Sequence, residues 1–402
     1  MRRYPTAADA SGRTFGPEEQ AALAGVLASG KLNFTVGGEH TPALEAEFAS
    51  MLGVRHAVAC SSGTAALHLA VAAVDPAPGD EIITTPITDF GTVIPILAQN
   101  AVPVFADVDP VTGLIDPDSV ESLISDRTRA IIAVHLMGAA APVDVLREIA
   151  DRHGIILIED CAQAYLTELP DGRLAGTVGQ VGCFSLQQYK HITCGDGGLA
   201  VTNDPDLART MRLFADKGWP RDTGQRTHLS LGFNYRMTEL QAAVARAQLT
   251  KLPDVVAARR RTAQRFADAL RDLPGIAVPD HLERHAVWLF PIVLDVAEAG
   301  GDNAAYAAKL AAEGVPASAG YLSQPVYLYP VLAERRLYGG SGFPFTSPPA
   351  RREFRYEPGL CPNAERLIGS RWLVIEWNER YSDADVAELA AAFTRVHEAL
   401  RR

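Results

Sequence analysis

Two segments of this sequence combine residue types and positions that could face a ligand. Residues Ser61–Ala65 place small side chains and a glycine where a helix is expected to begin, and backbone N–H groups at such a position could hold a phosphate. The same residue types are also ordinary helix caps. Asp160 ends the apolar run Ile155–Asp160, and ligands of open parallel sheets lie beyond the carboxyl ends of the strands. An aspartate at such a strand end is more often a turn or cap residue.

The third candidate is Lys190, in the segment Phe184–Gly198 between two expected strands. This segment is rich in polar residues and glycines. A lysine in such a place is usually a surface residue, and Gly195, Gly197 and Gly198 could form an ordinary turn. The three segments become informative through their order along the chain: an expected phosphate cradle, a strand-end aspartate, and a lysine after a later strand.

This order is the arrangement of fold-type-I enzymes that use pyridoxal 5′-phosphate, and the chain resembles the DegT/StrS family of sugar aminotransferases. The resemblance extends from about Gly12 to the C-terminus and is densest between Ser61 and Gln241. Four segments carry it: Ser62–Leu67, Glu159–Ala164, Phe184–Gly198 and Asn234–Gln241. Four segments in the order that the family shows are not expected by chance.

The resemblance implies two catalytic residues, Lys190 and Asp160. Lys190 is expected to hold the cofactor as a Schiff base and then to move a proton, because an amine is required to form that bond with the cofactor's aldehyde. Asp160 is expected to pair with the ring nitrogen and keep it protonated, so that the ring can take up electrons. In the second half-reaction the cofactor is expected to be pyridoxamine 5′-phosphate.

Further cofactor contacts are implied where the chain matches the family's motifs. The residues expected at the phosphate are Ser62, Gly63, Thr64 and Ser185. Asn234 is expected to reach the phosphate of a neighbouring subunit, so the expected assembly is a homodimer with shared active sites. Gln163 is expected beside the ring, near its 3′ oxygen. Phe90 lies where the family stacks an aromatic side chain on the ring, and a core phenylalanine is the alternative.

Around the lysine the chain departs from the family's usual pattern. Gln187 stands where a histidine is common, and His191 stands where an asparagine is common. The residues predicted on the substrate side are Gln187, His191, Arg236 and Tyr321. Arg236 is expected either to neutralise an anion or to brace its loop. The pair Gln187-Gln188 resembles cyclitol and aminobenzoate-type relatives. No metal site is predicted.

The elements that must position these residues show two successive patterns. Between residues 56 and 202 short apolar runs alternate with helical stretches, which predicts crossover connections and a largely parallel sheet covered on both faces. The expected strands are His56–Cys60, Glu81–Thr85, Val102–Val108, Ala130–Leu136, Ile155–Asp160, Gly182–Leu186 and Leu199–Thr202. The expected fold class is therefore α/β, and the resemblance implies a mostly parallel, mixed seven-stranded sheet between helices in a large domain over residues 12–250.

Residues 251–402 are expected to form a linker helix and a smaller α+β domain, as in fold-type-I transferases. The pattern predicts a long helix from about Pro253, a strand-like stretch over Val287–Leu294 and a helix over Ala304–Glu313. A loop rich in proline and tyrosine follows from Gln324 to about Pro349, and a final helix begins near Ser382.

Composition excludes several classes of function. The formal net charge of −11 argues against a nucleic-acid-binding surface, which needs clustered lysines and arginines. Five cysteines without a C-x-x-C pair predict neither a disulfide framework nor a zinc site. No apolar run approaches 18 residues, and no signal peptide is recognised, so a cytoplasmic protein is expected.

The predicted activity is transfer of an amino group from glutamate or glutamine to a keto-sugar, either nucleotide-linked or of the aminoglycoside or cyclitol kind. Natural-product or polysaccharide biosynthesis is the expected setting. Two alternatives stay open. A sugar dehydratase that uses pyridoxamine phosphate is disfavoured, because such members typically carry histidine at the position of Lys190. A non-catalytic regulator that binds the cofactor is disfavoured by the joint presence of Lys190, Asp160 and Ser185. The acceptor, the position aminated and the donor are not determined by the sequence.

Overall fold

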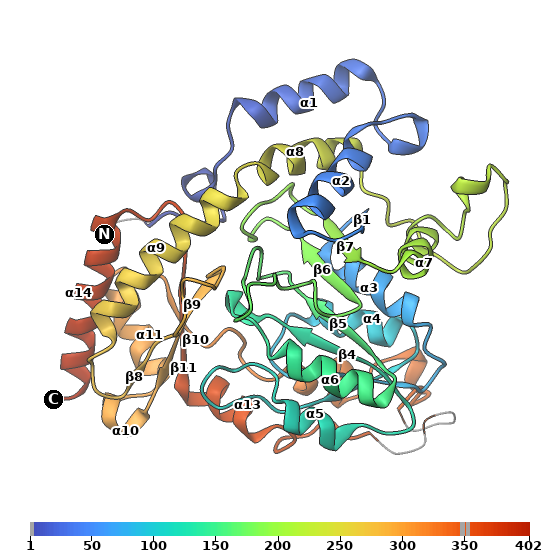
Figure 1. Ribbon diagram of the computed structural model, residues 1–402. Helices are drawn as coiled ribbons and strands as arrows, with labels where there is room; N and C mark the ends of the chain where they lie inside the picture. The colour runs from blue at the N-terminus through green and yellow to red at the C-terminus, as the bar shows by residue number, and fades with distance from the viewer. Residues whose placement is uncertain (1–3, 346–349, 351–353) are drawn as a thin grey trace.

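The computed structural model describes residues 4–345, 350 and 354–402, and it contains two β-sheets flanked by helices (Figure 1). The larger sheet has seven strands in the order β1-β7-β6-β5-β4-β2-β3. Its strands are β1 (His56–Cys60), β2 (Glu81–Thr84), β3 (Val102–Phe105), β4 (Thr128–Val134), β5 (Ile156–Asp160), β6 (Val181–Ser185) and β7 (Gly198–Thr202). Each lies within one or two residues of an apolar run at its start, so the predicted α/β fold with a mixed, mostly parallel sheet is confirmed.

Only β7 runs against its neighbours. It pairs antiparallel with both β1 and β6, whereas the pairs from β6 to β3 are parallel. Parallel neighbours need long crossovers, which contain helices between β2 and β5 and an irregular connection over residues 161–180 between β5 and β6. The carboxyl ends of β5 and β6 therefore meet at one edge of the sheet, where Asp160 ends β5 and Ser185 ends β6.

Helices cover both faces of this sheet because successive strand residues point to opposite sides. Ile158 of β5 packs in one hydrophobic cluster with helices α3 (Gly63–Val74) and α7 (Pro205–Ala215). Its neighbour Leu157 packs in another cluster with α2 (His40–Leu52) and α6 (Val143–His153). The remaining helices of this region are α1 (Pro17–Ser29), α4 (Ile94–Ala98), α5 (Pro117–Leu123) and α8 (Glu239–Leu249). Short 3-10 turns are η1 (Ala10–Gly12), η2 (Phe34–Val36), η3 (Phe90–Thr92), η4 (Leu136–Gly138) and η5 (Arg221–Thr223).

The smaller sheet is antiparallel throughout, in the order β10-β11-β9-β8. Its strands are β8 (Ile276–Ala277), β9 (Leu289–Leu294), β10 (Ala317–Ala319) and β11 (Trp372–Glu376). The helices around it are α9 (Leu252–Leu270), α10 (Val296–Ala299), α11 (Asn303–Ala312) and α14 (Asp383–Leu400). Ser382 caps α14 by accepting a hydrogen bond from the amide of Asp385, as its position before the final apolar stripe predicts. The predicted smaller α+β domain is confirmed.

Three features were not anticipated by the sequence patterns. Strands β10 and β11 were not predicted: β10 has only three small residues, and the apolar run of β11 was not assigned to a strand. The expected loop after Gln324 contains η6 (Val326–Leu328), α12 (Pro330–Ala333) and η7 (Tyr338–Gly340). The part of that loop over residues 346–349 lies outside the described residues. Farther along come α13 (Pro362–Arg366) and the π-helical turn η8 (Leu367–Arg371).

This region after Gln324 packs on the large sheet although it lies in the sequence between β10 and β11 of the smaller sheet. Tyr327, Phe345 and Tyr356 are buried in the same hydrophobic cluster as the strands of the large sheet. The ring of Phe105 at the end of β3 lies 5.6 Å from that of Tyr327 and 5.7 Å from that of Tyr356. The boundary predicted between residues 250 and 251 falls between α8 and α9, and the division into two folding units stays a prediction. Among the described residues no helix is both long and apolar enough to cross a membrane.

Candidate active site

A cavity of about 480 Å³ lies where the two sheets approach each other. Segments that are far apart in the sequence line it: Pro5, Thr6, Ala7, Asp89, Gln187, Tyr189, Lys190, Trp288, Leu289, Tyr321, Glu376, Trp377 and Asn378. The ring of Tyr4, the first residue that the structure describes, lies 5.9 Å from that of Tyr381 in the smaller domain. From there the N-terminal segment passes along the cavity as one of its walls.

Lys190 follows β6 and reaches this cavity. Its backbone N–H donates to the carbonyl oxygen of Gln187 at 2.9 Å, and its own carbonyl accepts from Nη1 of Arg13 at 2.8 Å. Burial lowers the pKa of the Lys190 amine, and the negative charges of Asp160 and Asp89 act against that shift. A lysine with a lowered pKa is a better nucleophile and proton carrier than an ordinary surface lysine.

Asp160 is buried at the end of β5 and has only neutral hydrogen-bond donors. Its Oδ2 accepts from the hydroxyl of Thr92 at 2.8 Å, and its Oδ1 accepts from the amide of Ala162 at 3.1 Å. Burial raises the pKa of Asp160, more than these hydrogen bonds and the charge of Lys190 lower it. A protonated ring nitrogen beside this carboxyl would stabilise its charged form, so the site fits the cofactor that the sequence predicts.

The predicted phosphate cradle lies at the N-terminus of α3. Ser62 caps the helix by accepting from the amide of Ala65 at 3.0 Å, and the first N–H groups of a helix have no partner within it. A Cβ added to Gly63 would lie 2.6 Å from the Cβ of Ser185. A Cβ added to Gly91 would lie 2.6 Å from the hydroxyl oxygen of Thr64. The structure thus brings Ser62, Gly63 and Thr64 together with the buried Ser185, and a larger residue than glycine would fill the space.

Both polar atoms of the Gln163 side-chain amide form hydrogen bonds. Its Oε1 accepts from the backbone N–H of Met137 at 2.7 Å, and its Nε2 donates to the hydroxyl of Tyr321 at 3.3 Å. Met137 has a φ of 56°, which is uncommon for a residue other than glycine and turns this amide toward Gln163. Burial raises the pKa of Tyr321, so its hydroxyl keeps its proton. Phe90 lies in η3 with its ring 5.7 Å from that of Tyr329.

The other predicted substrate residues lie in different places. Gln187 lines the cavity, and its Oε1 accepts from the amide of Tyr189 at 2.8 Å. His191 is completely buried and its Nε2 donates to the carbonyl of Ala286 at 3.0 Å, so it does not line the cavity. Asn234 is exposed on the segment between α7 and α8.

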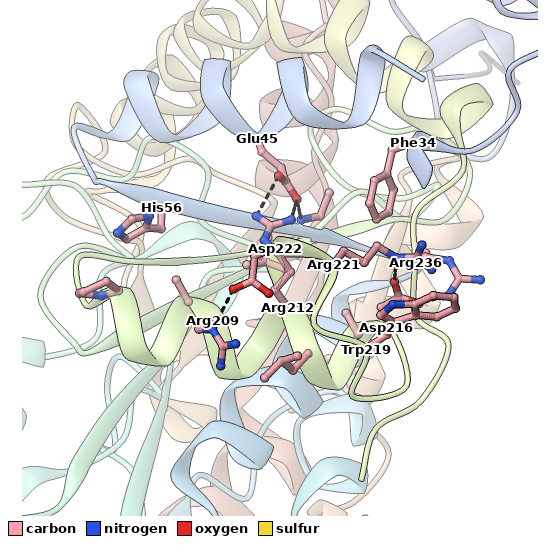
Figure 2. A pocket seen from close by; sticks show the side chains of 16 residues that line it. Phe34, Glu45, His56, Arg209, Arg212, Asp216, Trp219, Arg221, Asp222 and Arg236 are labelled. Carbon is pink, nitrogen blue, oxygen red and sulfur yellow. Dashed lines mark hydrogen bonds and ion pairs between the residues drawn. The ribbon is translucent and has the colours of Figure 1, made fainter. Parts of the chain in front are cut away.

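Arg236 lines a second pocket, of about 350 Å³, near α7 and β1 (Figure 2). Its guanidinium forms an ion pair with Asp216, and that carboxylate also pairs with Arg221. Two other arginines of this pocket are paired as well: Arg212 with Glu45 and Arg209 with Asp222. In this structure Arg236 therefore braces its loop.

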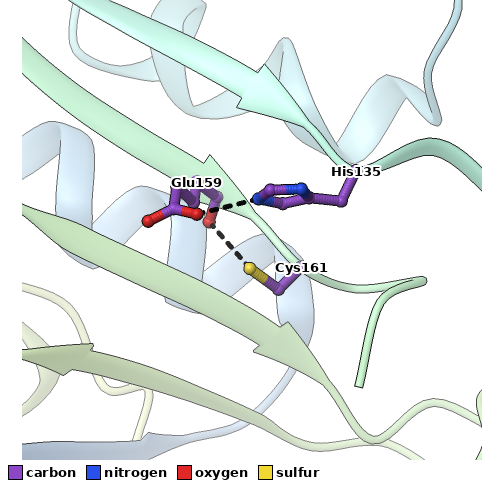
Figure 3. A group of neighbouring side chains, drawn as sticks. All are labelled: His135, Glu159 and Cys161. Carbon is purple, nitrogen blue, oxygen red and sulfur yellow. Dashed lines mark hydrogen bonds and ion pairs between the residues drawn. The ribbon is translucent and has the colours of Figure 1, made fainter. Parts of the chain in front are cut away.

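His135, Glu159 and Cys161 form a buried group whose side-chain atoms could in principle hold a metal ion (Figure 3). The Glu159 carboxylate already accepts from His135 Nε2 at 2.9 Å. It also accepts from three backbone amides, those of Gly176, Val178 and Gly179. Nδ1 of His135 accepts from the amide of Ala141 at 3.0 Å. The atoms of His135 and Glu159 that could bind a metal ion are thus engaged in tying a loop to the strand that carries Asp160.

Sequence reasoning missed three residues of this site. Trp288 lies beside Lys190, with Lys190 Nζ 4.3 Å from the centroid of its ring. Arg13 holds the lysine's carbonyl, and Thr92 holds Asp160. Trp288 was assigned only to a strand-like stretch, and neither Arg13 nor Thr92 belongs to a recognisable motif. No local pattern in the sequence distinguishes these residues.

Comparison with known proteins agrees with this geometry. A profile of the DegT/DnrJ/EryC1/StrS aminotransferase family matches residues 14–356. L-glutamine:2-deoxy-scyllo-inosose aminotransferase of Streptomyces kanamyceticus is 36% identical over 407 residues, covering 93% of this chain and 90% of that protein. The aminotransferase from Psychrobacter cryohalolentis superimposes with a TM-score of 0.85 at 30% identity, covering 97% of this chain and 99% of that one. DesV of S. venezuelae, solved with a ketimine intermediate, superimposes with a TM-score of 0.82 at 32% identity, covering 96% and 95%.

Proposed function

The chain belongs to the DegT/DnrJ/EryC1/StrS aminotransferase family, and on that premise we propose that it moves an amino group from glutamate or glutamine to the ketone of a sugar or cyclitol, with Lys190 at the reacting centre. Aminotransferase activity is the activity of the family, and pyridoxal 5′-phosphate, with its pyridoxamine form, is the typical cofactor. The observation that carries the assignment of Lys190 is that its side chain lines the cavity, while the buried carboxyl of Asp160, at the end of the neighbouring strand β5, acts on the pKa of its amine.

When bound, the cofactor supplies an aldehyde for the amine and a ring that takes up electrons. The residues of the chain have the other tasks. Asp160 would hold a proton on the ring nitrogen. Gln163, whose side-chain amide donates to the hydroxyl of Tyr321, would contact the ring. The amides of Gly63 and Thr64 and the hydroxyl of Ser185 would bind the phosphate. Lys190 would attach the cofactor and then carry the proton between carbon atoms.

For the acceptor we favour a keto-cyclitol. The relative from Streptomyces kanamyceticus is named for 2-deoxy-scyllo-inosose and L-glutamine, and it is 36% identical to this chain. The lining of the cavity supports a polyhydroxylated ring, because it combines the flat indole of Trp288 with the polar side chains of Thr6, Gln187 and Asn378. A nucleotide-linked keto-sugar is the alternative acceptor. The aminated ring would then be incorporated into an antibiotic or another natural product.

The test is an assay of the purified holoenzyme with L-glutamine or L-glutamate and two acceptors, 2-deoxy-scyllo-inosose and a nucleotide-linked keto-sugar. Mass spectrometry should find an amine product from the cyclitol. Borohydride treatment of the holoenzyme should fix the cofactor on the peptide that contains Lys190. The Lys190→Ala variant should lose turnover by at least about 10²–10⁴-fold, the range that a positioned acid–base group contributes. A label on another lysine, or a product that has lost water without gaining nitrogen, would refute the proposal.

A further inference from the structure

The amine of Lys190 lies over the face of an indole ring. Its Nζ is 4.3 Å from the ring centroid of Trp288, within the distance at which an ammonium is attracted by the negative face of an aromatic ring. Among the described residues Lys190 forms no ion pair and its amine has no hydrogen-bond acceptor. Among these residues, the ring of Trp288 is therefore the group that interacts with the amine at short distance.

Three interactions fix the orientation of the indole. Its Nε1 donates to the carbonyl oxygen of Tyr189, the residue before the lysine, at 2.7 Å. The backbone N–H of Trp288 donates to the carbonyl of Met137 at 3.0 Å. The ring of Tyr321 meets the indole edge to face, with centroids 5.7 Å apart and an interplanar angle of 84°. The indole is thus tied to the lysine loop and to the turn that holds Gln163, so its face is presented to the amine at low cost in conformational entropy.

The charged and titratable groups around the amine come from several elements. The carboxyl groups of Asp160 and Asp89 favour its charged form, whereas burial disfavours it. Tyr321 keeps its proton, because burial raises the pKa of its hydroxyl. His191, the next residue in the chain, is buried and uncharged, because burial lowers the pKa of its ring. In this surrounding the indole is a neutral group that stabilises an ammonium without forming a bond that must be broken when the amine reacts.

We propose that Trp288 is a positioning residue that receives the Lys190 ammonium whenever the amine is not bonded to the cofactor, and that it keeps this group charged and beside the reacting atoms. The inference rests on the proposed function, since it requires Lys190 to be the lysine that attaches the cofactor. The inference predicts the direction of a pKa shift. Loss of the aromatic face removes stabilisation of the ammonium and lowers the pKa of the unattached Lys190.

The experiment uses the enzyme loaded with pyridoxamine 5′-phosphate, in which the lysine is not bonded to the cofactor. Acetylation of Lys190 is followed by mass spectrometry across a series of pH values, with the exposed Lys309 as internal reference. Trp288→Leu removes the aromatic face and keeps an apolar side chain, so that water enters less than it would with alanine. Trp288→Phe keeps an aromatic face and removes the N–H that donates to Tyr189.

In Trp288→Leu the pKa of Lys190 should fall by about half a unit to one unit, which corresponds to a roughly three- to tenfold faster acetylation at pH values below the pKa. Trp288→Phe should give a clearly smaller shift. No shift in Trp288→Leu, or equal shifts in both variants, would overturn the inference, because equal shifts would assign the effect to the hydrogen bond with Tyr189. Borohydride labelling of the wild type distinguishes failure of the Trp288 inference from failure of the proposed function. A label on Lys190 leaves the proposed function standing, and a label on another lysine contradicts it.

Discussion

Glu159 and Asp160 are adjacent buried carboxyl groups with opposite properties. Burial raises the pKa of both, and in Asp160 that effect prevails. In Glu159 the hydrogen bonds from His135 and from the amides of Gly176 and Gly179 outweigh burial, so that its pKa lies below the usual range. Successive strand residues point to opposite faces, which gives the two carboxyl groups different surroundings. The Asp160 carboxyl binds Thr92 and the amide of Ala162, and the Glu159 carboxylate ties down the loop that contains Gly176.

Replacing Glu159 by glutamine should destabilise the protein. A glutamine side chain presents an NH₂ group to donors that need an acceptor, and each buried N–H left without one costs about 1–3 kcal/mol. The free energy of unfolding, measured by urea denaturation at pH 7, should fall by at least that amount. The exposed Glu148 on α6 offers the matched control, and Glu148→Gln should leave the free energy of unfolding within about 0.5 kcal/mol of the wild type.

The pH dependence of this difference has a definite sign. Because the folded state lowers the pKa of Glu159, its contribution to stability is complete above the unfolded value of about 4.3 and is lost as the pH falls through the folded value. The gap in unfolding free energy between wild type and Glu159→Gln should therefore narrow below about pH 4. A gap that stays constant to lower pH would mean that the carboxylate is not the stabilising group.

The site lies at one edge of the large sheet, where the ends of β5 and β6 meet the N-terminus of α3. Parallel pairing of β5 with β6 puts Asp160 opposite Cys183, two residues before Ser185. Helix α3 approaches the same edge through Gly63, which permits close contact with Ser185. The cradle therefore depends on the absence of one Cβ atom and on the register of one strand pair.

Gly63→Ala should weaken cofactor binding. The added Cβ would lie 2.6 Å from the Cβ of Ser185, which forces a displacement in the cradle. Overpacking of this kind costs about 1–3 kcal/mol, so the dissociation constant for pyridoxal 5′-phosphate should rise roughly five- to 150-fold in a titration of the apoenzyme. Gly25→Ala on α1 is the control, because a Cβ there has no neighbour within 4 Å. Unchanged affinity in Gly63→Ala would place the phosphate elsewhere.

At the scale of the whole molecule, the segment between α7 and α8 exposes apolar side chains next to Asn234. Leu229, Leu231 and Phe233 are 54%, 77% and 44% exposed, respectively, which is costly for a single chain in water. We propose that a second copy of the chain covers this segment and receives Asn234 at its phosphate site, which is the homodimer that the sequence predicts.

Mixing two inactive variants tests this assembly. If Asn234 acts in the neighbouring subunit, a hybrid of Lys190→Ala and Asn234→Ala chains contains one intact site, and an equal mixture should recover about a quarter of the wild-type activity. Each variant alone should be nearly inactive. A mixture of Lys190→Ala with Lys190→Arg should recover none. Failure of the first mixture to recover activity, with exchange of subunits verified by mass spectrometry, would mean that each site is built by one chain.

The sequence alone determined what depends on local pattern. Short apolar runs between helical stretches located the seven strands of the large sheet, because buried strands of a parallel sheet have this pattern. The resemblance carried by four segments identified the aminotransferase family and pointed to Lys190 and Asp160. The capping box at Thr238 likewise predicted the start of α8.

Contacts between distant residues became visible in the three-dimensional structure. Trp288 and Tyr189 are 99 positions apart, and Arg13 and Lys190 are 177 positions apart, so their contacts leave no local signal. The burial of His191, the pairing of Arg236 with Asp216 and the wall formed by Pro5–Ala7 were settled in the same way. A contact between distant segments depends on the packing of whole elements, and that packing is not encoded in the spacing of any one segment.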